Sequence, residues 1–380
     1  MRSEEIVELG KRHRGISRQD ARHGIFGGIE LNGGAVDSYR IAIPIPTSGA
    51  AGIWGPSCLA CATIASELWN AAGGFKGQEI HLTILDASDE STTLEDELRQ
   101  LIEDEEIDAI VGMHTSSVRQ RISKVVNATL PFIYTPLYEG GPLPSGVLAI
   151  GETPDRQLLP AMNWLTTTYH LKRWYLVGND YIWPRRSHAI AAQSLASAGC
   201  QVVGSRYVAL GHWDVERLID EIRRSSAQAV LMSLVGQDAV EFCRAFGASG
   251  LSSRVLRLSC AIEENGLLAI GSKYTEGLFV SSGYFASLGT EGNGAFKERY
   301  WSRFGERAPV LNALGQSTYE GIAFLRGLLD RGRVIGSVVD FDSVRATRWR
   351  SNSEKITPMY LAQADGMSFQ VIRALGSNSV

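Results

Sequence analysis

The feature that most constrains the fold of this 380-residue chain is a repeated alternation of strand-like and helix-like segments. It begins at residues 39–46, where YRIAIPIP predicts a strand, followed by a glycine-rich loop and a helix over 57–74 that ends at paired glycines. The alternation continues to residue 136, and the same order starts again after residue 154. Strands and helices at this spacing predict parallel sheets covered by helices on both faces. We therefore expect an α/β fold with two doubly wound parallel-sheet lobes.

The two ends of the chain depart from this alternation. The first 38 residues are polar and interrupted by glycines, and we treat them as an N-terminal appendage without an assigned role. The segment MYLAQADGMSFQVIRAL near the end predicts a β-hairpin that turns at Asp365 and Gly366. The length of the chain agrees with two domains, because single hydrophobic cores rarely grow to this size.

Composition restricts the classes of partner. Basic and acidic residues number 37 and 41, which gives a formal net charge of −4, and they are spread along the chain. Because nucleic acids and anionic membranes attract basic surfaces, we expect neither as a direct partner, and an uncharged or zwitterionic small molecule is favoured. The sequence has no apolar run long enough for a membrane span, and its first forty residues lack a signal-peptide pattern. As printed it predicts a cytoplasmic protein, or a periplasmic or extracytoplasmic one if a leader was removed.

The motifs that usually mark catalysis or metal binding are absent from the sequence. It has no P-loop, no GxSxG, no HExxH and no GxGxxG after a strand. The five cysteines are scattered and odd in number, which is typical of a reducing compartment. Cys58 and Cys61 are interpreted as small side chains on a buried helical face, since no second ligand pair follows at metal-site spacing. We expect no metal, no cofactor and no catalytic residues, and we favour a binding protein over an enzyme.

Ligands of doubly wound sheets bind beyond the carboxyl ends of the strands. The loops at those positions are 47–54, 113–117 and 134–139 in the first lobe, and 179–183 and 236–238 in the second. Their Ser, Thr, Tyr, Trp, Asn, Gln and Asp residues suit a small polar ligand held by hydrogen bonds against an aromatic wall. These loops are therefore the predicted binding site.

Several candidates on these loops have a structural alternative. Ser116 and Ser117 begin a helix, so their hydroxyl and N–H groups either bind a carbonyl or carboxylate oxygen or cap the helix. Tyr181 follows Asp180, which places an aromatic ring beside a carboxylate, although Asp180 is also interpreted as a cap of the following turn. His114 is either a pocket residue or a partly exposed loop histidine.

The motifs PTSG, NAAGG, AIVGMHTSS, IYTPLYEGG and YLVGNDYIWPRRS together resemble the type I periplasmic-binding-protein fold, and within it the branch of amide and urea receptors. The similarity extends over residues 39–375 and is greatest to the amide-sensing negative regulators of bacterial amidase operons. NAAGG is typical of the superfamily, whereas TPLYEG and GNDYIWPR are more specific to this branch. The resemblance implies a cytoplasmic sensor that closes on a short aliphatic amide and controls a partner regulator protein.

The resemblance also implies roles for individual residues. Family ligands lie beside a serine that matches Ser116 and a tyrosine that matches Tyr181, and a first-lobe wall matches residues 134–136. The sequence departs from the sensors at His114, where they carry tyrosine, and in its YTPLYEG segment, which bears on the size and identity of the ligand. The ligand-binding residues predicted from loops and resemblance together are Trp54, His114, Thr115, Ser116, Ser117, Tyr134, Thr135, Pro136, Asp180, Tyr181, Gly236 and Asp238.

The fold implied by the resemblance has three crossovers between the lobes, which we place near residues 152–154, 281–284 and 332–340. The resulting division assigns residues 39–153 plus 284–333 to lobe 1 and residues 154–283 plus 338–375 to lobe 2.

A second interpretation is the substrate-binding receptor of an ABC transporter for urea, short amides or branched-chain amino acids, whose partner would be a transporter permease. An amino acid needs paired sites, for which Asp180 or Asp238 would bind the ammonium and the helix start at Ser116 the carboxylate. Whether the chain forms a homo-oligomer is left open by the sequence.

Overall fold

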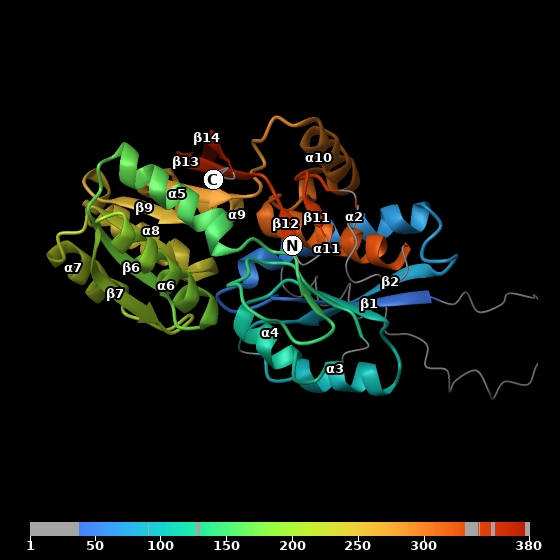
Figure 1. The fold of residues 1–380 in the computed structure, drawn as a ribbon. Coiled ribbons are helices and arrows are strands. Elements are labelled where there is room, and N and C mark those ends of the chain that lie inside the picture. Colours follow the sequence, from blue (N-terminus) through green and yellow to red (C-terminus); the bar gives the residue numbers. More distant parts are fainter. Residues whose placement is uncertain are drawn as a thin grey trace, which may run out of the picture.

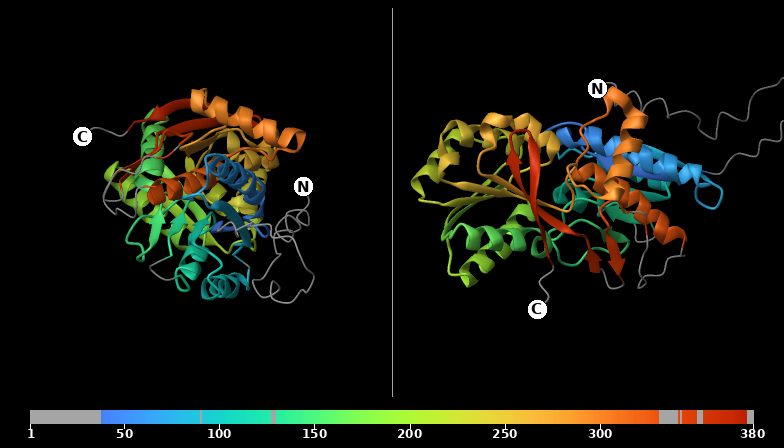
Figure 2. Two further views of the ribbon diagram at one scale, coloured as in Figure 1. Left: turned by 90° about the vertical axis from the view of Figure 1, so that its right-hand side faces the viewer. Right: turned by 90° about the horizontal axis from the view of Figure 1, so that it is seen from above.

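The computed structural model describes residues 38–89, 91–126, 130–330, 341, 343–350 and 354–376. The strands of this part of the chain form two large sheets, and each sheet is the core of one lobe (Figure 1). Views from the side and from above show the same two lobes next to each other (Figure 2). The predicted α/β fold with two lobes is confirmed.

The first lobe contains a five-stranded parallel sheet in the order β2-β1-β3-β4-β5. Its strands and helices are β1 (Ser38–Ile45), α2 (Gly55–Ala71), β2 (Glu79–Asp86), α3 (Leu94–Glu103), β3 (Ala109–Gly112), α4 (Ser116–Ile122), β4 (Phe132–Tyr134), β5 (Val147–Ala149), α10 (Glu291–Phe304) and α11 (Ala313–Asp330). Successive residues of β1 face opposite sides of the sheet. Ile41 and Ile43 therefore pack with α2 and α11, whereas Ala42 packs with α3 and α4.

The second lobe contains a seven-stranded sheet in the order β14-β13-β10-β9-β8-β6-β7. Its strands and helices are α5 (Pro154–Thr168), β6 (Arg173–Asn179), α6 (Ile182–Ser197), β7 (Gln201–Val208), α7 (Val215–Arg224), β8 (Ala229–Ser233), α8 (Gly236–Ala248), β9 (Leu256–Ser259), α9 (Glu264–Ile270), β10 (Leu278–Ser282), β13 (Met359–Asp365) and β14 (Ser368–Leu375). Trp174 and Leu176 pack with α5 and α6, and Tyr175 and Val177 pack with α7 and α8 on the other face.

Short elements complete the described structure. They are the 3-10 turns η2 (Gly52–Trp54), η3 (Leu251–Ser253), η4 (Ser272–Tyr274) and η5 (Gly305–Arg307), and an antiparallel pair of strands, β11 (Arg348–Arg350) and β12 (Glu354–Ile356). None of the helices in the described part of the chain is long and apolar enough to cross a membrane.

The structure corrects the expectation of two parallel sheets. The second sheet is mixed, because the predicted C-terminal hairpin is present and joins it as antiparallel strands β13 and β14. Helix α6 begins at Ile182, and Pro184 lies in its first turn, where a backbone N–H has no helical partner to lose. Strand β9 and helix α9 were not predicted. Cys58 and Cys61 are fully buried on α2, as expected.

The chain passes from the first lobe to the second between β5 and α5, and it returns between β10 and α10. Ser343 and Thr347 still form hydrogen bonds with Glu320 of α11 before the chain enters β13. The third crossover, predicted at 332–340, lies outside the described residues, and so does the predicted appendage apart from Ser38.

Buried charges connect the segments next to the crossovers. The guanidinium of Arg345 donates from Nη1 to Glu152 Oε1 at 2.9 Å and from Nη2 to Glu320 Oε2 at 2.5 Å. The three side chains are only 1%, 6% and 0% exposed, so all of them depend on one another for neutralisation. Removing one partner of such a buried pair typically costs about 3–5 kcal/mol. The network therefore holds the first crossover, α11 and the segment after α11 together.

Candidate functional site

A cavity lies between the lobes, beyond the carboxyl ends of their strands. It encloses about 340 Å³ of empty space, part of which is open to solvent. We call it the aromatic chamber, and its lining residues are Trp54, His114, Thr115, Ser116, Tyr134, Pro136, Leu137, Tyr181, Trp183, Val235, Ala261, Glu263 and Leu314. Because both lobes contribute lining residues, a molecule bound here would contact both lobes at once.

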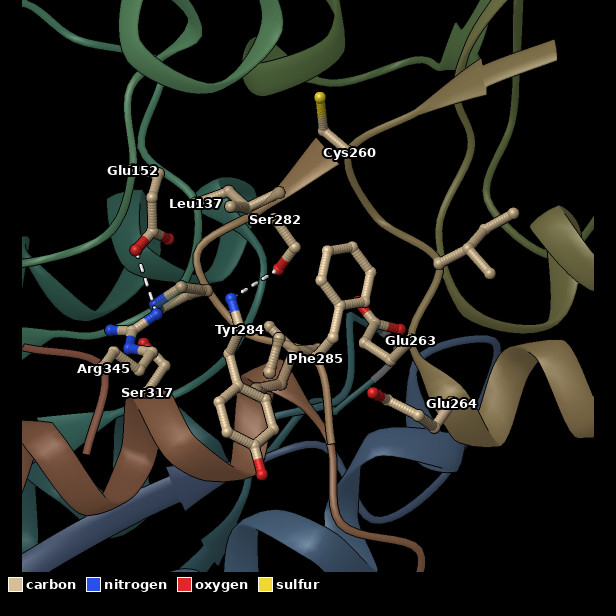
Figure 3. Close-up of a pocket in the computed structure, with 14 residues that line it drawn as sticks. Leu137, Glu152, Cys260, Glu263, Glu264, Ser282, Tyr284, Phe285, Ser317 and Arg345 are labelled. Carbon is tan, nitrogen blue, oxygen red and sulfur yellow. Dashed lines mark hydrogen bonds and ion pairs between the residues drawn. The ribbon is translucent and has the colours of Figure 1, made fainter. Parts of the chain in front are cut away.

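A second hollow adjoins the first on the side of the crossovers (Figure 3). We call it the crossover chamber; it has about 410 Å³ of empty space, and Pro136, Leu137, Glu263 and Leu314 line both chambers. Its remaining lining residues are Glu152, Cys260, Ile262, Glu264, Ser282, Tyr284, Phe285, Ala313, Ser317 and Arg345. The two chambers therefore adjoin, with four lining residues in common.

Aromatic side chains form one wall of the aromatic chamber. The rings of Tyr181 and Trp183 are nearly parallel, with centroids 6.5 Å apart and an interplanar angle of 27°. Burial raises the pKa of the Tyr181 hydroxyl well above its usual range, so the phenol stays neutral. Trp54, on the opposite lobe, is 5% exposed and donates from Nε1 to Glu263 Oε2 at 3.2 Å. This hydrogen bond joins the lobes directly across the chamber.

Ser116 faces the chamber with its hydroxyl proton already engaged. Its Oγ donates to Glu139 Oε2 at 2.6 Å, and Glu139 also forms a buried ion pair with Arg119. Tyr134 lies 3.2 Å from the same Oγ, but its own hydroxyl donates to the carbonyl of His114 at 3.1 Å. A serine hydroxyl has one proton and two lone pairs. Toward a ligand, Ser116 Oγ is therefore an acceptor rather than a donor.

His114 is buried and neutral. Its Nδ1 lies 3.1 Å from the carbonyl of Thr115, which can only accept, so this nitrogen carries the proton. Burial lowers the pKa of the ring to about 4. Among the described residues Nε2 has no hydrogen-bond partner, and a Cβ placed on Gly112 would lie 2.5 Å from it. Gly112 thus provides the space into which the imidazole packs, beside the ring of Tyr134 at a centroid distance of 5.4 Å.

Two carboxylates that the sequence interpretation missed belong to the site. Glu263 lines both chambers and Glu264 lines the crossover chamber, and both follow the unpredicted strand β9. Burial, and secondarily the charge of Glu264, raises the pKa of Glu263 to about 8. Burial also raises the pKa of Glu264 to about 7, although its Oε1 accepts from the N–H of Ala286 at 2.6 Å. A predicted strand at residues 256–259 would have led to both by the strand-end rule.

The other predicted first-lobe residues divide into two groups. Thr115 and Pro136 line the chamber, but the Thr115 hydroxyl caps α4 and donates to Asp89 Oδ1 at 2.8 Å. Ser117 also donates to Asp89 and does not line the chamber. Thr135 donates to the carbonyl of Gly112 and packs under α11, because neighbouring residues of a strand point to opposite faces.

The predicted second-lobe residues other than Tyr181 do not line the chamber. Asp180 is half exposed and pairs with Arg185 at 2.6 Å. Asp238 is buried, but it accepts from Asn179 Nδ2 at 2.5 Å and from the N–H of Gly211 at 3.0 Å, which occupies it within its own lobe. Neither carboxylate therefore faces the chamber, whereas Glu263 does.

Gly236 has a different function from the one expected, because it forms a contact between the lobes. It adopts φ of +54°, and a Cβ on it would lie 2.0 Å from the carbonyl oxygen of Ala50. That oxygen accepts from the N–H of Gln237 at 2.8 Å, and a second interlobe bond runs from Asn265 Nδ2 to Ile53 O at 2.7 Å. These contacts join the two lobes directly.

In the described part of the chain, no group of three or more His, Cys, Asp or Glu side chains is arranged to hold a metal ion. The polar groups of the two chambers are hydroxyls, carboxylates, one guanidinium and one neutral imidazole. Their chemistry suits hydrogen bonding to an organic molecule.

Comparison with known proteins places this geometry in context. The family model described as periplasmic binding protein matches residues 38–368. Similar solved structures include a solute-binding protein of an ABC transporter from R. palustris in complex with benzoate, with 15% identity, a TM-score of 0.73, and coverage of 89% of this chain and 96% of that one.

Two amino-acid receptors give comparable matches. An amino acid ABC transporter substrate-binding protein from Pseudomonas fluorescens Pf-5 has 15% identity and a TM-score of 0.74, covering 89% of this chain and 95% of that one. A branched chain amino acid ABC transporter ligand-binding protein from Burkholderia xenovorans LB400 has 16% identity and a TM-score of 0.69, covering 89% and 96%. At these sequence identities the similarity shows a shared fold.

Proposed function

The chain belongs to the periplasmic binding protein family, and from this premise we propose that it is a solute-binding receptor whose two lobes close on a small polar molecule. The observation that carries the proposal is that the aromatic chamber takes its lining from both lobes. A ligand there gains its full set of contacts only in the closed arrangement, so binding shifts the equilibrium toward closure.

We favour delivery to a transporter permease over control of a regulator protein. The similar structures include receptors of ABC transporters, whereas the amide-sensing regulator is supported only by the resemblance of TPLYEG and GNDYIWPR. We also propose binding without turnover. His114 Nδ1 is bonded to a backbone carbonyl, and Ser116 donates to a carboxylate already paired with Arg119, so the chamber lacks a hydroxyl activated by an imidazole.

The chamber favours a ligand rich in N–H donors. Glu263 and Ser116 Oγ both offer acceptor oxygens toward the space between the lobes. Among its described lining residues there is no lysine or arginine, so a free carboxylate such as benzoate would have no cation to pair with. A short aliphatic amide or urea supplies the required N–H groups and a compact apolar part for the aromatic wall. An amino acid is the alternative, with its ammonium on Glu263.

Isothermal titration tests these assignments against acetamide, propionamide, butyramide, urea, leucine and benzoate, followed by product analysis. Saturable binding of an amide or urea with unchanged ligand supports the proposal. Preference for leucine would move the assignment to an amino-acid receptor, and preference for benzoate would contradict the argument from the missing cation. Conversion of any compound to product would replace the receptor by an enzyme.

A further inference from the structure

We propose that the crossover chamber is a second subsite of the ligand cavity, which takes the ammonium end of a longer solute whose amide end lies in the aromatic chamber. This inference rests on the proposed function and specifies its ligand class. The solute would be an aliphatic chain with an N–H-bearing group at one end and a primary ammonium at the other.

The first argument is that the two chambers adjoin. Leu137 and Glu263 come from opposite lobes, and both residues line both chambers. Leu137 and Leu314 provide an apolar surface common to the two chambers, on which a methylene chain would pack without losing hydrogen bonds. A ligand confined to the aromatic chamber would leave the second space unused.

The second argument concerns charge. The crossover chamber is lined by the carboxylates of Glu152, Glu263 and Glu264 and by the guanidinium of Arg345. Arg345 is bonded to Glu152 and also to Glu320 behind it, so its charge is already compensated. Among the described residues, no lysine, arginine or histidine forms an ion pair with Glu263 or Glu264. Two carboxylates therefore face the chamber without a cation of their own.

The third argument concerns the position of those carboxylates. Glu263 is only 7% exposed, and its Oε2 accepts from Trp54 Nε1. Figure 3 shows the joined pair of Glu152 and Arg345 on one side of the space and Glu263 and Glu264 on the other. Burial raises the pKa of both acids, which is the response expected of carboxylates that lack a nearby cation. An alkylammonium would supply that missing charge with three donors.

The test is a titration of the full chain at pH 8 with butyramide and with its amino-terminated relatives 4-aminobutanamide, 5-aminopentanamide and 6-aminohexanamide, together with cadaverine. At least one amino amide is expected to bind ten times more tightly than butyramide. Glu264→Gln, which keeps the acceptor for Ala286 but removes the charge, is expected to abolish that gain. Glu276→Gln, an exposed acid of the same lobe, is the matched control and should change neither affinity.

A second variant tests the space instead of the charge. Ala313 lines only the crossover chamber, so Ala313→Leu should reduce the affinity for the amino amides at least tenfold without changing that for butyramide. Equal affinity of butyramide and every amino amide would overturn the second subsite while leaving the proposed function intact. If cadaverine binds while no amide does, and Glu264→Gln abolishes this binding, the second subsite would be supported. The proposed binding of an amide group in the aromatic chamber would then be refuted. Absence of binding for every compound of the series would overturn both the second subsite and the proposed function.

Discussion

Replacing Gly236 by alanine should weaken ligand binding without touching the cavity. The substitution places a methyl group 2.0 Å from the carbonyl oxygen of Ala50 on the opposite lobe, a distance that real Cβ contacts do not reach. The lobes would have to move apart there, and the Gln237–Ala50 hydrogen bond would be stretched or lost. A ligand that contacts both lobes would then have to overcome this steric repulsion to bring the lobes together.

The magnitude follows from two contributions. Alanine in the left-handed region at φ of +54° costs roughly 1 kcal/mol in both the open and the closed arrangement, so this cost cancels in binding. The lost interlobe hydrogen bond contributes about 0.5–1.5 kcal/mol to the closed state alone. The steric contact adds to this, and we expect a total of at least about 1.4 kcal/mol, which corresponds to a tenfold loss of affinity.

The matched control is Gly199→Ala. Gly199 lies in the second lobe with φ of +66°, and no described atom lies within 4 Å of a Cβ placed there. The control should therefore lose similar thermal stability and keep its affinity, measured by titration with the compound that the native chain binds from the amide and urea panel. Identical affinities for the native chain and both variants would refute the role of this contact in closure.

Three further results are expected. Tyr181→Ala should weaken binding by more than about 1 kcal/mol, because the ligand loses an aromatic surface; a titration with unchanged affinity would exclude Tyr181 from the ligand contacts. The pKa of Glu263 is raised to about 8, above its unfolded value near 4.5, so the stability it contributes is present below pH 4.5 and is lost as the pH rises toward 8. In guanidinium chloride unfolding, the free energy of unfolding should decrease less between pH 5 and pH 8 for Glu263→Gln than for the native chain, by on the order of a few kcal/mol. The same pH dependence in both proteins would contradict this. Cys61→Ser should leave binding intact, since the thiol is buried on α2 away from both chambers, and loss of binding would revive a redox role.

The sequence predicted the elements whose hydrophobic pattern is regular. A helix was expected over residues 57–74 and is observed as α2 over Gly55–Ala71, whose small and apolar side chains pack with β1 and α11. Strand β9 was missed because Arg257 interrupts its apolar pattern. In the folded chain this arginine is fully buried and donates to the backbone carbonyls of Tyr274 and Glu276. Hydrogen bonds between residues so far apart in the sequence leave no local sequence pattern from which the strand could be predicted.

The site was predicted in part for a related reason. The strand-end rule located His114, Ser116 and Tyr181 on the chamber because their loops begin at recognised strands. It failed for Glu263, whose strand was not recognised. It also included Asp238, which does not line the chamber because it is hydrogen-bonded to Asn179 and Gly211 within its own lobe. Loop position predicts which residues are near the site, whereas tertiary hydrogen bonds decide which remain free for a ligand.

The buried network of Arg345, Glu152 and Glu320 has a mechanical consequence. Since one guanidinium fixes two chain segments to α11 at the place where the lobes join, those segments cannot slide past each other without exposing or separating buried charges. Relative motion of the lobes is then expected to pivot near Arg345. A distance between two labels far from this pivot, for example at exposed positions near Lys76 and Arg206, should therefore report how far the lobes have opened.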